Sequence, residues 1–104
     1  MAILIRATEE KKITISGTDI ELTQVYGRIR FLGDYSGTSI EGEVATFANI
    51  ATFEEGKMLY TDVPIGSYKS ELEAGEIQSL DTAHKYAKLA YEQLGYEVII
   101  DMTA

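Results

Sequence analysis

The sequence of residues 79–101, SLDTAHKYAKLAYEQLGYEVIID, predicts a helix that passes directly into a strand. Ser79 suits the N-cap, and Gly95 stands where a helix commonly ends in a left-handed residue. Apolar residues recur at helical spacing at Leu80, Ala83, Ala87, Ala90 and Leu94. We therefore expect an amphipathic helix over about residues 79–94 and a final strand over 96–101.

The first half of the chain predicts antiparallel β-structure. Residues 21–33 and 38–47 alternate between apolar and polar side chains and enclose the turn-like segment 34–37. A hairpin that turns there places opposite charges on one face and apolar side chains on the other. The expected pairs are Arg28 with Glu43, Arg30 with Glu41, and Phe31 with Ile40.

The remaining β-type segments are shorter. Runs at 2–7 and 12–16 predict an opening hairpin, and residues 57–60 and 68–72 are further candidate strands. Between the last two runs, Val63-Pro64-Ile65-Gly66 favours a β-turn.

Taken together, these patterns predict a single α+β domain over residues 1–104. We expect a mainly antiparallel sheet of β-hairpins, with the C-terminal helix packed on it as one layer. The expected core consists of Ile3, Ile5, Val25, Ile29, Phe31, Val44, Leu80, Leu94, Val98 and Ile100.

Composition narrows the possible functions. The chain has a net charge of −8, and residues 31–104 hold 13 acids against four bases. Nucleic-acid affinity rests largely on Lys and Arg, so this balance disfavours direct binding of DNA or RNA. No apolar run approaches the roughly 20 residues of a membrane helix, so no membrane contact is expected.

Residues suited to catalysis or metal binding are scarce. The chain has no cysteine and a single histidine, His84, which we expect on a partly exposed flank of the helix. One histidine beside Asp81 supplies too few ligands for zinc and lacks a nucleophile. The glycines match no phosphate-binding or dinucleotide motif. We therefore expect no catalytic residue, no metal and no cofactor.

Tyrosine is the unusual feature of the composition, because the chain has seven tyrosines and no tryptophan. Tyrosine suits protein interfaces, since its ring packs while its hydroxyl stays hydrated. The candidate interface residues are Tyr26 on the charged face of the hairpin, Tyr35 at its tip, and Tyr86 and Tyr91 on the flanks of the helix. The alternative is that most of the tyrosines line the rim of the core.

The segment YTDVPIG at 60–66 and the run LEAGEIQSLDTAHKYAKLAYEQLGYEVIID at 72–101 together resemble small virion structural proteins of tailed bacteriophages, notably those that infect Bacteroidetes. The resemblance implies an oligomeric particle component, such as a capsid, head–tail or tail accessory protein. It also implies localisation in the virion after assembly in the host cytoplasm. No catalytic residues follow from it.

Two hypotheses about function remain open at this point. The first is a non-enzymatic structural or assembly protein that contacts copies of itself or other particle subunits through exposed tyrosines and open sheet edges. The alternative is a small acidic binding or inhibitory module whose residues 31–104 engage a basic partner protein, and in that case we expect the protein in the cytoplasm. Oligomeric state distinguishes the two.

Overall fold

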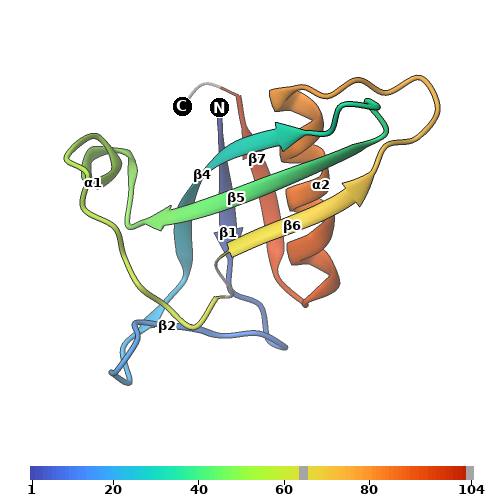
Figure 1. Cartoon of the computed structure of the whole chain (residues 1–104). Helices are drawn as coiled ribbons and strands as arrows, with labels where there is room; N and C mark the ends of the chain where they lie inside the picture. The colour runs from blue at the N-terminus through green and yellow to red at the C-terminus, as the bar shows by residue number, and fades with distance from the viewer. Residues whose placement is uncertain (64–65, 103–104) are drawn as a thin grey trace.

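A computed structural model describes residues 1–63 and 66–102 and has the expected α+β architecture (Figure 1). Its main sheet is antiparallel, with the strand order β6-β5-β4-β1-β7. These strands are β1 Ala2–Arg6, β4 Gln24–Gly33, β5 Ser39–Phe47, β6 Gly66–Glu71 and β7 Glu97–Asp101. A separate two-stranded sheet pairs β2 Ile13–Thr14 with β3 Glu21–Leu22. The helices are α1 Ile50–Glu54 and α2 Leu80–Gln93.

Helix α2 and strand β7 confirm the prediction for the C-terminal segment. The Ser79 side chain accepts a hydrogen bond from the Thr82 backbone N–H at 3.1 Å, and Gly95 has a φ of +102°. The helix lies behind the sheet in Figure 1 and connects its two edge strands, β6 and β7. One layer of helix therefore covers one face of the sheet.

The buried side of α2 differs from the expected stripe. Its buried residues are Ala83, His84, Tyr86, Ala87 and Tyr91. Leu80 and Leu94 are 42% and 43% exposed, so the prediction that they belong to the core was wrong. The alanines let the helix backbone approach the sheet, and tyrosine rings supply the apolar area that leucines were expected to supply.

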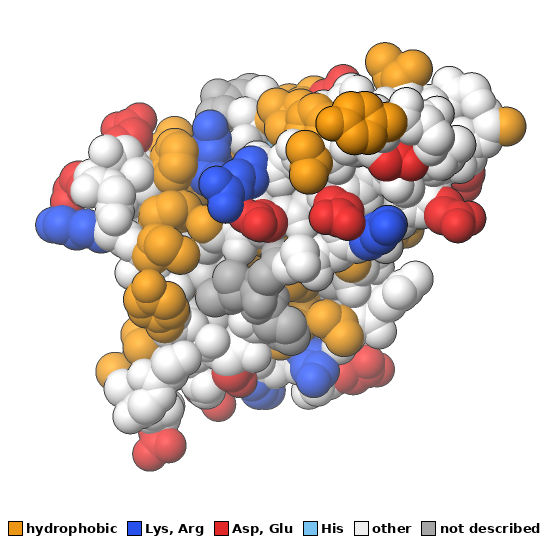
Figure 2. Space-filling view, in the orientation of Figure 1, with side chains coloured by type: hydrophobic (Ala, Val, Ile, Leu, Met, Phe, Trp, Pro, Cys, Tyr) orange, Lys and Arg blue, Asp and Glu red, His pale blue; other side chains and the backbone are white. Residues whose placement is uncertain are grey.

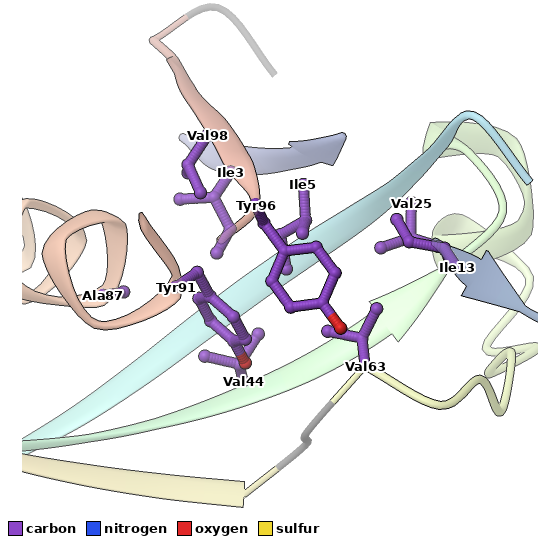
Figure 3. Close-up of a cluster of buried hydrophobic side chains, with 10 residues drawn as sticks. All are labelled: Ile3, Ile5, Ile13, Val25, Val44, Val63, Ala87, Tyr91, Tyr96 and Val98. Carbon is purple, nitrogen blue, oxygen red and sulfur yellow. The ribbon is translucent and has the colours of Figure 1, made fainter. Parts of the chain in front are cut away.

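The main core lies between α2 and the sheet (Figure 3). It contains Ile3, Ile5, Ile13, Val25, Val44, Val63, Ala87, Tyr91, Tyr96 and Val98. The rings of Tyr91 and Tyr96 meet edge to face, with centroids 6.5 Å apart. Ile29 and Ile100 pack against this core as expected. Phe31 is 37% exposed near the loop of the β4–β5 hairpin, so the prediction that it belongs to the core was wrong.

The expected N-terminal hairpin does not form. Strand β1 instead lies inside the sheet, where Ile3 pairs with Gly27 of β4 on one side and Ile100 of β7 on the other. This apolar strand is buried at Ile3 and Ile5, so its backbone N–H and C=O groups need hydrogen-bond partners. Pairing with strands on both sides supplies those partners. Gly27 makes this packing possible, because a Cβ there would lie 2.9 Å from Cγ1 of Ile3.

The β4–β5 hairpin forms, but its register is shifted by two residues from the prediction. Arg30 pairs with Glu43, and Gly33 pairs with Ile40. The cause is a longer loop, in which the Asp34 carboxylate accepts hydrogen bonds from the backbone N–H groups of Thr38 at 3.0 Å and Ser39 at 3.2 Å. A shift of two residues leaves each side chain on its predicted face.

The segment from 48 to 77 contains one helix that the sequence pattern did not indicate, α1. Residues 57–60 form no strand; the Leu59 N–H donates to the Thr46 carbonyl at 3.0 Å, and the Thr46 hydroxyl donates to the Leu59 carbonyl at 2.8 Å. Strand β6 covers most of the run predicted at 68–72. The turn predicted at 63–66 includes residues 64–65, which lie outside the described residues.

Candidate protein-interaction surface

The face of the main sheet opposite α2 carries the surface of greatest functional interest. We call it the open face; it holds Tyr26, Arg28, Arg30, Leu32, Glu41, Glu43, Ala45, Phe47 and Lys69. Figure 2 shows this face, with charged side chains of both signs gathered beside apolar ones. Glu43 lies 2.5 Å from Arg30, and Glu41 lies 3.9 Å from Lys69. Among the described helices, only α1 contacts this side of the sheet.

Helix α1 is held by a reciprocal cap and places an aromatic ring on the open face. The Asn49 side chain accepts from the Thr52 N–H at 3.0 Å, and the Asn49 N–H donates to the Thr52 hydroxyl at 3.1 Å. The ring of Phe53 then meets Phe47 edge to face at 5.1 Å and lies 6.0 Å from the ring of Tyr26. These rings form a second, smaller core.

Arg28 is fixed above that aromatic cluster. Its guanidinium carbon lies 4.3 Å from the centroid of Phe53, and its Nη1 donates to the Tyr26 hydroxyl at 3.1 Å. The side chain is half-buried. Across residues 1–63 and 66–102, no carboxylate forms an ion pair with Arg28. Although the chain has a net charge of −8, Arg28 is therefore an oriented cation with no ion-pair partner among these residues.

Arg28 lines a depression of about 800 Å³ on the open face, which we call the groove. Its side chains are Arg28, Arg30, Glu43, Ala45, Phe47, Phe53, Met58 and Ser67. Apolar atoms form most of it, and Met58 is 44% exposed at its margin. Arg30 and Glu43 of this lining pair with each other, so Arg28 is the cation that the groove can offer to a partner. An apolar depression with such a cation is suited to bind an apolar side chain that lies beside a carboxylate.

The opposite end of the sheet exposes a second set of apolar side chains. Leu32 is 70% exposed, Ile77 is 72% exposed, and Tyr35 is fully exposed. We call this region the tip, and define it by these three residues and the exposed acid Glu73 beside them. Gln78 joins its two loops, because its Nε2 donates to Oδ1 of Asp34 at 2.9 Å and to the Ser39 carbonyl at 2.8 Å.

Hydrogen bonds order both loops of the tip. The Ser36 hydroxyl and the backbone N–H groups of Ser39 and Thr38 lower the pKa of Asp34 well below its usual range. Glu76 accepts from Lys85 and from the Tyr86 hydroxyl, and these bonds lower the pKa of Glu76 to about 2. Both carboxylates are therefore ionised and bonded at neutral pH.

The four candidate tyrosines have different environments. Tyr26 is 4% exposed beneath α1, so its predicted place outside the core was wrong; Phe53 covers it. Tyr91 lies in the main core, where burial raises its pKa to about 12. Tyr86 is 9% exposed and bonded to Glu76. Tyr35 is fully exposed at the hairpin loop and is the member of this set that offers its whole ring to a partner.

His84 is also buried, against the prediction of a partly exposed position. It is 1% exposed between α2 and the sheet, and its Nδ1 lies 2.7 Å from the Leu80 carbonyl. Nε2 has no hydrogen-bond partner among the described residues. Burial lowers the pKa of His84. The side chain is therefore a neutral core residue whose Nδ1–H donates to Leu80.

The two edges of the main sheet differ from its faces. β6 and β7 are the outer strands, and β7 has an acid at each end, Glu97 and Asp101, which discourages pairing with a second β7. Within the described parts of the chain, no three potential ligands cluster to hold a metal. None of the described helices is long and apolar enough to span a membrane.

Sequence reasoning did not identify the groove. Phe47 and Phe53 lie on either side of Asn49, the N-cap residue of α1. This spacing is the signal that could have indicated a short helix that brings the two rings together. An apolar Ile77 within an acidic loop is the corresponding signal for the tip. Comparison of the chain with protein-family models, with curated proteins and with solved structures found no match.

Proposed function

We propose that this protein is a non-enzymatic assembly component that acts by protein–protein contact through the open face and tip. The observation that carries the proposal is the groove, in which Arg28 is oriented by Tyr26 and Phe53 and lacks an ion-pair partner among the described residues. An exposed apolar depression with a fixed cation is characteristic of an interface, where aromatic and Arg side chains dominate binding.

Self-association is the form of contact that the arrangement favours. The chain exposes apolar groups at two separate places, the groove and the tip, and one copy can offer both to neighbours. The resemblance of residues 60–66 and 72–101 to structural proteins of tailed-phage virions supports a place in a virus particle. Under this proposal, Tyr35 is the candidate tyrosine that contacts a neighbour.

The test compares two substitutions of equally exposed apolar residues. Met58 at the groove and Leu89 on the outward side of α2 are both 44% exposed. Sedimentation velocity over a wide concentration range should show association of the parent protein and of Leu89→Glu, and a monomer for Met58→Glu. Circular dichroism checks that each variant is folded. A parent protein that stays monomeric at every concentration contradicts the proposal and favours the alternative, an acidic module that binds a basic partner.

A further inference from the structure

The groove and the tip have complementary chemistry. The groove combines an apolar wall of Phe47, Phe53 and Met58 with the cation of Arg28. The other charged groups of its lining, Arg30 and Glu43, neutralise each other as an ion pair. The tip presents Ile77, 72% exposed, in the same loop as Glu73, whose side chain is 76% exposed. The tip therefore has an apolar group and a carboxylate, the pair of features that the groove is suited to receive.

The two surfaces cannot meet within one molecule. Ser67, at the start of β6, lines the groove, whereas the loop that carries Glu73 and Ile77 follows the last residue of β6, Glu71. Figure 1 shows α1 and this loop at opposite ends of the long β5–β6 pair. A contact between groove and tip therefore requires two copies of the chain.

We propose that the tip of one copy docks into the groove of the next, with Ile77 against Phe53 and Met58 and with the Glu73 carboxylate on Arg28. This inference rests on the proposed self-association and names the surfaces that make it. Because the two surfaces differ, the contact is head to tail, and repetition produces a ring or an open filament.

The charges of the molecule agree with this arrangement. Within its own molecule, Glu73 forms only a long ion pair, because its carboxylate lies 3.9 Å from Nζ of Lys85. Lys85 lies closer to Glu76, at 2.8 Å. Glu73 can therefore turn to Arg28 of a neighbour while Glu76 keeps Lys85 neutralised. The new ion pair joins two groups at the edge of an apolar contact, where it adds specificity and speeds association.

A mixing experiment tests the head-to-tail contact. Arg28→Gln damages the groove and leaves the tip intact, whereas Ile77→Ser damages the tip and leaves the groove intact. Each variant alone should associate roughly tenfold or more weakly than the parent protein, as expected for loss of a central interface residue. An equal mixture should form dimers that stop growing, because each dimer joins one intact groove to one intact tip.

Each outcome has a defined meaning. Dimers in the mixture, with monomers in each variant alone, support the docking of tip into groove. Unchanged association of both variants overturns the inference while leaving the proposed self-association standing. Monomers in the mixture as well as in the single variants also overturn it, provided that circular dichroism shows both variants folded. A parent protein that never associates contradicts the proposed function itself.

Discussion

The two faces of the main sheet are built from the same strands but differ in what covers them. The inner face, under α2, is closed by aliphatic residues and by the rings of Tyr91 and Tyr96. On the open face, Phe53 of α1 rests on Tyr26 and Phe47, and among the described helices no other one covers this side of the sheet. The comparison teaches that alternation along the strands gives one sheet two different faces: the inner face is closed by α2, whereas Arg30, Leu32, Glu41 and Glu43 of the open face stay exposed. Under the proposed function, the open face is the one that meets a partner.

The largest difference between the two faces is expected when one residue on each face is truncated to alanine. Ile5 is fully buried on the inner face, and Leu32 is 70% exposed on the open face. Ile5→Ala should lower the free energy of unfolding by about 2–5 kcal/mol, because it removes buried methylenes and leaves a cavity. Leu32→Ala should change it by no more than about 0.5 kcal/mol. Urea denaturation measures both, and equal losses would contradict the assignment of the two faces.

A methyl group added to the inner face tests how closely that face is packed. A Cβ at Gly42 would lie 2.2 Å from the Tyr68 ring, whose hydroxyl donates to the Ala83 carbonyl of α2. Gly42→Ala should therefore cost about 1–3 kcal/mol by forcing the ring away. Gly37→Ala is the control, because an added Cβ there would contact nothing and the only cost is that alanine disfavours the φ of +72°. Thermal unfolding of both variants should show the larger loss at Gly42.

The inner face should also respond to pH through His84. Its pKa is lowered by burial, and the N-terminus and Arg28 lower it further, whereas the Leu80 hydrogen bond and Asp81 raise it. The unfolded chain binds a proton near pH 6.5 and the folded chain does so only at lower pH. Stability is therefore complete above about pH 6.5 and decreases as the pH falls below that value.

The matching measurement is urea denaturation between neutral and mildly acidic pH. The parent protein should lose stability over this range, and His84→Gln should show a smaller dependence because it has no group that titrates there. An identical slope in the two proteins would show that His84 does not carry the effect. The lowered pKa values of Asp34 and Glu76 act at lower pH, so they do not obscure the comparison.

The smallest effect is expected from the charges of the open face. Arg30 and Glu43 lie 2.5 Å apart, but their side chains are 83% and 56% exposed. Glu43→Gln should lower the free energy of unfolding by less than about 1 kcal/mol, because water screens the pair. Added salt should reduce the difference between this variant and the parent protein. A loss as large as that of Ile5→Ala would show that the open face contributes to the fold as the inner face does.

The sequence predicted much of the fold because the decisive signals are local. The cap at Ser79, the stop at Gly95 and the alternation of residues 21–47 predicted α2, β7 and the faces of the β4–β5 hairpin. Its register was not predictable from alternation, because hydrogen bonds of Asp34 lengthen the loop. Strand β1 was misassigned since its partners lie far away in the chain.

The candidate site was harder to predict than the fold. Tyr26 is buried by Phe53, which comes from a helix too short to give a periodic signal. Whether Arg28 has an ion-pair partner depends on which acids lie near it in space. The predicted register paired Glu43 with Arg28, but in the structure Glu43 pairs with Arg30. Of the tyrosines chosen for their interface chemistry, Tyr35 alone was both predicted exposed and found fully exposed.

Thiol labelling tests most directly whether the open face is the surface buried by association. The chain contains no cysteine, so Met58→Cys at the groove and Leu89→Cys on α2 each introduce one reactive group at a position of equal exposure. Both should react with a maleimide at similar rates in dilute solution. At concentrations where the protein associates, the account predicts slower labelling at position 58 and unchanged labelling at position 89. Protection at position 89 with none at position 58 would contradict it.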